Sequence, residues 1–456
     1  MVIKSLLQPY KETDTWKWGI VVLTFLAPFF FLSYGFANQY AAHLINVPSI
    51  VFEWEKYIPL WPWTIIPYWS IDLFYGLSLL LCWNKFELKQ QTLRLITAQI
   101  IAVSSFLLFP LKFSVERPEL EGFLGFWFEI LMEFDQPFNQ APSLHIVLLI
   151  ILWDFYRRHW GSRWKYIVDL WSLLIGVSVL TTWQHHFIDV PTGILVGAFC
   201  LWLFPVSTLS PLQKSPLQSP TPKHYKISTY YFISAGLLFS LAFIVKSLSF
   251  LFIYPAISCL LISIAYLTAR PHFFQKQNNH KMSAASYILF TPYFIFAWLN
   301  SRLWTYKHPK DVHIITLNHC AIFLGRIPRH QNLQHYDLFF DCCAELPTYP
   351  VHNSSSFFSL DLIPLNAQQL HIAVKNFEQL IQAQSLTYPR SNLLISCALG
   401  YSRSSVILIG YLLKSKNAQT VKDAMQIIQT ARPWVIINKN QIEQLHYYHI
   451  QLKEFI

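Results

Sequence analysis

Eight long apolar runs restrict what this chain can fold into more than any other feature. Most of them are long enough to span about 30 Å of hydrocarbon as helices. Hydrophobic residues make up 54% of the 456 residues and charged residues only 13%, which is too apolar for an ordinary soluble protein. We therefore predict a multi-pass integral membrane protein. The runs occupy 19–37, 64–83, 95–110, 143–153, 167–183, 190–206, 229–245 and 247–269.

Lys and Arg residues collect in alternate loops between these runs. They are concentrated at the N-terminus and at 85–94, 157–165 and 214–226, and by the positive-inside rule these segments face the cytoplasm. The first run has no small-residue cleavage site after it, so we expect a retained anchor and not a signal peptide. This asymmetry accounts for much of the net charge of +10, and no nucleic-acid partner is needed to explain it.

Composition divides the chain into five parts. Residues 1–206 hold the first six runs, and 207–228 read as a Ser/Pro-rich cytoplasmic linker. Two further runs fill 229–270. The segment 271–312 contains an uncharged stretch that suits either a ninth span or a helix lying on the inner face. We favour eight spans because basic residues flank this stretch on both sides, and eight spans keep the soluble part, 313–456, in the cytoplasm.

Strand-like and helix-like runs alternate in the soluble part, which predicts an α/β domain. The predicted strands are 314–317, 321–325, 338–343 and 393–395, and the predicted helices are 367–383 and those that begin at Ser404 and Asn440. The whole chain is thus predicted to be a multi-span α-helical membrane bundle followed by an α/β domain.

The segment 393–404, Leu-Leu-Ile-Ser-Cys-Ala-Leu-Gly-Tyr-Ser-Arg-Ser, joins a predicted strand to a predicted helix. A loop that closes onto a helix N-terminus directs several backbone N–H groups and the positive end of the helix dipole into one hollow, which suits a phosphate. The same field favours the thiolate of Cys397. Arg403 offers a planar fork to two phosphate oxygens, and Gly400 permits the tight turn.

Together Cys397, Gly400, Arg403 and Ser404 resemble the signature loop of the Cys-dependent protein tyrosine phosphatases, in particular the dual-specificity branch. The resemblance covers 313–456 and implies the α/β fold of this phosphatase type. It also implies that Cys397 is the nucleophile, that Arg403 and Ser404 take part in catalysis, and that Gly400 belongs to the phosphate-binding loop.

Thiol chemistry also needs an acid that protonates the leaving oxygen. The family places an Asp on a mobile loop upstream of the Cys, and Asp361 fits that position. Asp337 and Asp341, in or beside a predicted strand, are weaker candidates. The stretch 288–328 is further similar to the phosphatidylglycerophosphate phosphatase subgroup.

Two histidines and one aspartate adjoin different apolar runs at the face predicted to lie outside. His145 begins the fourth run, and His185 and Asp189 are four residues apart, hence on one side of a helix that begins there. This set suits transfer through a phosphohistidine, in which His185 attacks phosphorus, Asp189 fixes its tautomer and His145 protonates the leaving oxygen. Lys112 and Arg117 in the preceding loop would bind the phosphate.

This set, within about 60–206, resembles the type 2 phosphatidic acid phosphatase superfamily of lipid phosphatases and phosphotransferases. The resemblance rests on an Arg-Pro pair at Arg117, a Pro-Ser-Leu-His run that ends at His145 and a His-x-x-x-Asp motif at His185. It implies the same roles for these residues. Fusions of the two phosphatase types occur among bacterial membrane proteins, and the chain resembles them from end to end, which implies a location in a bacterial inner membrane.

The resulting prediction is a bifunctional membrane phosphatase that acts on phosphorylated lipids or lipid-linked head groups, with a phosphohistidine site outside and a phosphocysteine site inside. Alternatives remain open: either domain is a non-catalytic phosphate-binding module, the C-terminal domain is a protein phosphotyrosine/serine/threonine phosphatase, or the helical domain is a lipid head-group phosphotransferase or a lipid transporter. The predicted partners are a phosphorylated lipid or phosphoprotein substrate and the membrane. No cofactor, metal or disulfide is predicted, because the seven cysteines lack zinc spacing and form no extracellular framework.

Overall fold

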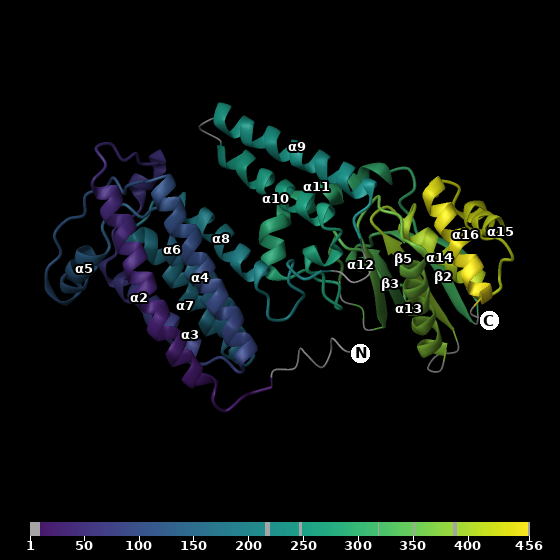
Figure 1. Cartoon of the computed structure of the whole chain (residues 1–456), viewed down its shortest axis with the longest axis horizontal. Coiled ribbons are helices and arrows are strands. Elements are labelled where there is room, and N and C mark those ends of the chain that lie inside the picture. Colours follow the sequence, from purple (N-terminus) through teal and green to yellow (C-terminus); the bar gives the residue numbers. More distant parts are fainter. Residues whose placement is uncertain are drawn as a thin grey trace. The chain divides into compact units, whose positions relative to one another are not determined.

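The computed structural model describes residues 10–214, 219–245, 249–317, 319–349, 351, 353–385 and 390–454. The chain divides into two compact units, Met1–Ser207 and Thr208–Ile456. The first is helical, and the second combines apolar helices with an α/β domain (Figure 1).

The first unit contains every one of the six apolar runs predicted before residue 207, each on a helix. A further short helix, α5, lies in the loop between the third and fourth runs, where none was predicted. The helices are α2 (Thr15–Ala42), α3 (Ile65–Leu80), α4 (Lys85–Leu108), α5 (Gly122–Phe134), α6 (Leu144–His159), α7 (Lys165–Thr181) and α8 (Asp189–Leu203), with 3₁₀ turns at Glu53–Tyr57 and Pro62–Thr64.

Close packing of α8 on α6 brings the first turns of these two helices together. Gly193 and Gly197 on α8 leave room for the α6 backbone, since a Cβ added at Gly193 would lie 2.8 Å from the carbonyl oxygen of Ser143. Ser143 caps α6 through its hydroxyl, and its backbone N–H donates to the carbonyl oxygen of Asp189 at 3.1 Å. The helix starts that carry His145 and Asp189, two of the predicted site residues, are therefore adjacent.

Three apolar helices open the second unit: α9 (Pro222–Ile244), α10 (Ser249–Leu267) and α11 (Ala284–Trp304), with a 3₁₀ turn, η4 (Pro271–Phe274), before α11. α9 and α10 pair through the hydroxyl groups of Ser228 and Ser263, which lie 2.9 Å apart. α9 begins inside the segment 207–228 that was predicted to be an extended linker. Pro222 at its first position and the Thr221 cap explain this start.

Four of the described helices, α2, α4, α9 and α10, are long and apolar enough to cross a membrane by length and composition. The helices α3, α6, α7 and α8 carry other predicted spans but have only 15 to 17 residues. A straight crossing takes about 20 residues. The multi-span bundle therefore stays a prediction, which these four helices support.

The prediction of an α/β domain in the C-terminal part of the chain is confirmed. Its sheet has the strand order β1-β2-β5-β3-β4, in which β1 is antiparallel to β2 and all other neighbours are parallel. The strands are β1 (Val312–Leu317), β2 (Cys320–Arg326), β3 (Leu338–Cys343), β4 (Ser354–Ser359) and β5 (Ser391–Cys397). The edge strand β4 was not predicted, because its run of serines lacks the β-branched residues that mark strands.

Helices on one face of the sheet share a single apolar core with it (Figure 1). They are α13 (Ala367–Ser385), α14 (Arg403–Lys414), α15 (Val421–Ala431) and α16 (Lys439–Glu454), and a short helix, α12 (His330–Leu333), adjoins a smaller cluster with Phe339 and Leu394. α14 is buried along almost its whole length, which explains why its sequence is apolar on all sides. The core thus fixes α14 behind the carboxyl end of β5.

Candidate active site

The central strand β5 places Cys397 at its carboxyl end, and α14 begins six residues later at Arg403. Ligands of parallel sheets bind at this edge, and a helix N-terminus there attracts anions. Gly400 adopts φ +69°, and a Cβ added there would lie 2.3 Å from the carbonyl oxygen of Gly325. The loop from 397 to 403 can therefore take this shape only with glycine at 400.

The sulfur of Cys397 accepts two hydrogen bonds in the loop. The donors are the backbone N–H of Gly400 and the hydroxyl group of Ser404, each at 3.3 Å. Burial by itself raises the pKa of the Cys397 thiol, but the positive charge of Arg403 and the hydrogen bonds from Ser404 and Gly400 outweigh burial, so that its pKa lies below the ordinary thiol value. The thiolate is the reactive form of cysteine.

Arg403 is held by a buried carboxylate that was not predicted from the sequence. Its Nη1 donates to Oε2 of Glu345 at 2.9 Å and to the carbonyl oxygen of Ser359 at 2.7 Å, and its Nη2 bonds Oε1 of Glu345. Both side chains of the pair are 3% exposed. Glu345 follows β3, the neighbour of β5, so its place just beyond a strand end was a usable signal.

Asp361 lies next to the guanidinium group, with Oδ1 3.1 Å from Nη2 of Arg403. Its side chain remains 37% exposed. Partial removal from water raises the pKa of Asp361, and nearby Glu345 adds to this effect while Arg403 opposes it. The next residue, Leu362, has φ +61°, a strained backbone that directs the turn.

The two weaker candidates for the acid lie elsewhere, and each has other partners. Asp341 is buried between Lys276 and His280, and Asp337 accepts a hydrogen bond from the backbone N–H of Asn392. The structure therefore brings Asp361, of the three aspartates, to the arginine of the loop.

Arg432 supports the loop from behind and is completely buried. Its Nε donates to the carbonyl oxygen of Gly400 at 3.2 Å, and its Nη1 donates to that of Leu324 at 2.9 Å. The loop is thus tied to the strand β2 by a side chain that lies outside the 393–404 segment.

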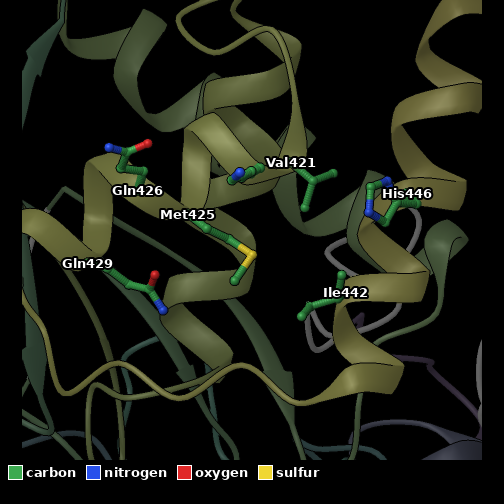
Figure 2. A pocket seen from close by; sticks show the side chains of 7 residues that line it. Val421, Met425, Gln426, Gln429, Ile442 and His446 are labelled. Atoms are coloured by element: carbon green, nitrogen blue, oxygen red, sulfur yellow. The ribbon is translucent and has the colours of Figure 1, made fainter.

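A cavity of about 880 Å³ adjoins the loop. Its walls include Leu399 and Tyr401 of the loop, Asp361, Leu303 and Trp304 at the end of α11, and Tyr306 just after that helix. A separate hollow of about 650 Å³ lies between α15 and α16, lined by Met425, Gln429 and His446 among others (Figure 2). The second hollow contains none of the predicted site residues and the first contains Asp361, so the first is the candidate active-site pocket.

Residues 322–451 match the family model described as the dual specificity phosphatase, catalytic domain. This region is a dual-specificity phosphatase domain. The protein is accordingly a phosphoric monoester hydrolase.

Several solved structures are similar to about a third of this chain at low sequence identity. A structure of PTPMT1 has 18% identity and a TM-score of 0.25, and covers 32% of this chain and 98% of its own. Human DUSP28 has 19% identity and a TM-score of 0.27, and covers 32% and 99%. A leucine rich repeat and phosphatase domain containing protein from Entamoeba histolytica has 16% identity and a TM-score of 0.26, and covers 33% and 98%. No curated protein matches the chain.

In the helical unit, outside the phosphatase domain, His145 and His185 line one cavity of about 200 Å³. His185 Nδ1 lies 3.2 Å from Oδ2 of Asp189, which also accepts the backbone N–H of His186 at 3.0 Å. The ring of His145 stacks on Tyr68 with centroids 4.0 Å apart. The three predicted residues of this site therefore meet.

The two predicted phosphate-binding cations do not line this cavity in the described structure. Arg117 donates to the carbonyl oxygen of Trp183 at 2.9 Å, and Lys112 is exposed. Two carboxyl groups line it instead, those of Asp72 and Asp135. Negative charge here would repel a phosphate dianion, although burial raises the pKa of Asp135 and so favours its neutral form.

Proposed function

We propose that the phosphatase domain hydrolyses the phosphomonoester of a membrane lipid, with Cys397 as the nucleophile. The observation that carries the chemistry is the hydrogen bonding of the Cys397 sulfur by Gly400 and Ser404 beside the charge of Arg403, which together lower the pKa of the thiol. A thiolate at a helix N-terminus that also binds phosphate is set for attack on phosphorus.

In the first step the thiolate of Cys397 attacks phosphorus, the P–S bond forms and the P–O bond to the alcohol breaks. The backbone N–H groups of the loop and Arg403 bind the phosphoryl oxygens. Asp361, whose pKa is raised, gives its proton to the leaving oxygen. Because Asp361 pairs with Arg403, we infer that the incoming phosphate replaces this carboxylate on the guanidinium group, and that the released carboxylate takes up a proton from solvent before it acts as the acid.

In the second step water attacks the phosphocysteine, and the Asp361 carboxylate accepts the proton from the water. The P–S bond breaks and inorganic phosphate leaves. Ser404 stabilises the departing thiolate through its hydroxyl hydrogen bond. The second step ends with Asp361 protonated and Cys397 ionised, as they were at the start of the first step.

The preference for lipid over protein rests on the wall of the active-site pocket. Leu303, Trp304 and Tyr306 are 74%, 68% and 81% exposed around it. Leu303 and Trp304 end α11, and Tyr306 follows it. α11 packs on α10, one of the helices able to cross a membrane. An apolar surface at this position suits an amphiphilic substrate better than a polar peptide.

The test compares substrates with purified full-length protein in phospholipid micelles. Phosphatidic acid, phosphatidylglycerophosphate and a phosphotyrosine peptide are supplied at equal concentration, and released phosphate is measured. We expect turnover of a lipid and its loss in Cys397→Ser. Faster turnover of the peptide than of both lipids would favour the phosphoprotein alternative, and no turnover of any substrate would contradict the proposal.

We propose a second activity for the helical unit, hydrolysis or head-group transfer through a phosphohistidine at His185. The support is the shared cavity of His145 and His185 and the bond from His185 to Asp189. Since neither Arg117 nor Lys112 lines that cavity in the described structure, a cation of the substrate or a rearranged Arg117 would have to offset the phosphate charge. Activity with phosphatidic acid that survives Cys397→Ser and disappears when His185→Ala is added to that variant would support this site; its survival in the double variant would exclude it.

A further inference from the structure

Both flanks of α11 are attached to the phosphatase domain. Before the helix, Lys276 forms an ion pair of 2.6 Å with Asp341 on β3, and the backbone N–H of Thr348 donates to the carbonyl oxygen of His280 at 3.0 Å. The hairpin that carries Lys276 and His280 ends directly before α11. The start of the helix is therefore fixed on the domain.

The end of α11 is fixed on the same domain by a second set of bonds. The hydroxyl group of Ser301 donates to the carbonyl oxygen of Ala398, the residue after Cys397, at 2.6 Å. Arg302 donates to the carbonyl oxygen of Ile327 at 2.9 Å. The last turn of α11 thus directly supports the phosphate-binding loop.

This double attachment bears on whether α11 crosses a membrane. Its 21 residues extend over about 30 Å, the thickness of the hydrocarbon layer. A crossing helix would place its two flanks on opposite sides of the bilayer, but one folded domain holds both. α11 is also absent from the four described helices that are long and apolar enough to cross.

One face of α11 is nonetheless apolar and exposed. Ile295, Phe296, Leu299 and Leu303 are 56%, 69%, 46% and 74% exposed, and their spacing places them on one side of the helix. The opposite side, with Phe290 and others, is buried. The exposed face continues into the wall of the active-site pocket at Leu303.

Positive charges border this apolar face. The ring of Trp298 lies 5.3 Å from the guanidinium group of Arg302 and 5.8 Å from that of Arg329, and the exposed residues Lys307 and Lys310 follow the helix. An apolar helix face bordered by Arg, Lys and Trp is the pattern of helices that lie in the interface of an anionic bilayer. α11 packs against α10, a helix able to cross a membrane, so α11 would lie next to the bilayer that α10 crosses.

We propose that α11 lies in the plane of the membrane interface, with its face 295–303 inserted among anionic phospholipids, and that it presents the active-site pocket to the bilayer surface. The phosphatase domain and the segment 271–283 then lie on one side of the membrane. That lipid substrates enter the pocket from the bilayer rests on the proposed function; the position of α11 does not.

The position of α11 is tested by labelling in sealed cells. Lys281→Cys and Lys310→Cys, both at exposed positions, are made singly in a full-length chain whose native cysteines are replaced by serine. A membrane-impermeant maleimide is applied before and after lysis. We expect the two positions to react in the same condition. Reaction of one before lysis and the other only after lysis would show that α11 crosses the bilayer and would overturn the proposal, whatever the enzyme hydrolyses.

Insertion of the α11 face into the bilayer is tested with the double variant Ile295→Glu/Phe296→Glu. Neither residue lines the pocket. The matched control is Ile450→Glu on α16, 55% exposed against 56% for Ile295. Both are reconstituted in vesicles of phosphatidylcholine and phosphatidylglycerol. We expect the double variant to lose at least roughly tenfold in hydrolysis of vesicle-borne phosphatidylglycerophosphate while hydrolysis of soluble p-nitrophenyl phosphate stays within about twofold. Equal loss on both substrates, or no loss on either, contradicts insertion of the α11 face into the bilayer. If the unaltered enzyme does not hydrolyse p-nitrophenyl phosphate at all, the proposed function is contradicted instead.

Discussion

Lys276 and Asp341 form an ion pair in which the two side chains are 1% and 0% exposed, with Nζ 2.6 Å from Oδ2. The same ammonium group donates to the carbonyl oxygen of Cys343 at 2.8 Å, and His280 lies 3.1 Å from the same carboxylate oxygen. Burial raises the pKa of Asp341, but Lys276 and His280 outweigh burial and lower it. The segment before α11 is therefore an integral part of the phosphatase domain.

We expect Lys276→Ala to destabilise the second unit strongly, because it leaves the buried carboxylate of Asp341 without its main partner. Breaking a buried pair in this way costs about 3–5 kcal/mol. Urea unfolding followed by tryptophan fluorescence measures the change, with Lys281→Ala at an exposed position as the control. A loss no greater than that of the control would show that the pair does not hold the segment to the domain.

The same pair predicts an acid dependence. A carboxyl group with a lowered pKa stabilises the fold above its unfolded pKa of about 3.9, and this contribution is lost as the pH falls through its folded pKa. The difference in stability between the unaltered protein and Lys276→Ala should therefore be full near neutral pH and shrink in acid below about pH 4. A difference independent of pH would exclude the carboxylate as the cause.

A second prediction concerns the thiolate of Cys397. Because the pKa of this thiol is lowered, alkylation by iodoacetamide should persist at a pH where an ordinary cysteine is unreactive. Ser404→Ala removes the hydroxyl hydrogen bond and should move the midpoint of the rate profile to higher pH. Ser405→Ala is the control, since its buried hydroxyl group has no hydrogen-bond partner in the described structure. An unshifted midpoint in Ser404→Ala would show that Ser404 does not stabilise the thiolate.

Much of this site could be predicted because its chemistry is local in sequence. Cys397, Gly400, Arg403 and Ser404 lie within eight residues, so one strand, one turn and one helix start determine their arrangement. Glu345 could not be placed in the same way. Its contact with Arg403 depends on the order of parallel strands, which brings the ends of β3 and β5 together only in the folded sheet.

The helical unit shows the same limit. His185 lies in the turn before α8, which begins at Asp189, so this turn and not a shared helix face sets their hydrogen bond. The approach of His145 depends on the packing of α8 against α6 at Gly193. The direction of the Arg117 side chain, toward the carbonyl oxygen of Trp183, depends on the loop conformation and was not encoded in the spacing. Long-range packing therefore decided which of the predicted residues share the cavity.

A third prediction concerns Asp361 as the acid. Asp361→Asn cannot donate a proton to the leaving oxygen, so hydrolysis of an alkyl phosphate should fall by about 10²-fold or more, whereas p-nitrophenyl phosphate, which has a good leaving group, should be affected less. The decline of activity at higher pH that deprotonation of Asp361 causes should also disappear. Asp337→Asn serves as the control, because Asp337 lies directly before β3 and its carboxylate accepts a hydrogen bond from the backbone N–H of Asn392. Equal losses on both substrates would assign Asp361 to binding instead.

The last prediction is that Glu345 keeps Arg403 in place to bind phosphate. Glu345→Gln removes the charge from a buried two-pronged pair, which leaves Asp361 as the remaining carboxylate near the guanidinium group. The arginine should then bind Asp361 more tightly, so the variant loses both phosphate affinity and the free acid. Charged hydrogen bonds of this kind contribute about 1.5–3 kcal/mol, which corresponds to a roughly ten- to hundredfold fall in kcat/KM.

A double-mutant cycle separates this role from a loss of stability. If Arg403 mediates the coupling, Glu345→Gln should cost less in kcat/KM when Asp361→Asn is already present, since the competing carboxylate is then gone. The control is Glu378→Gln, whose partner Lys414 lies in a partly exposed pair on the helices α13 and α14. Because that pair is far less buried than Glu345 and Arg403, its loss should leave kcat/KM unchanged. Additive effects of Glu345→Gln and Asp361→Asn would mean that the two carboxylates act on Arg403 independently, and the positioning role of Glu345 would then be wrong.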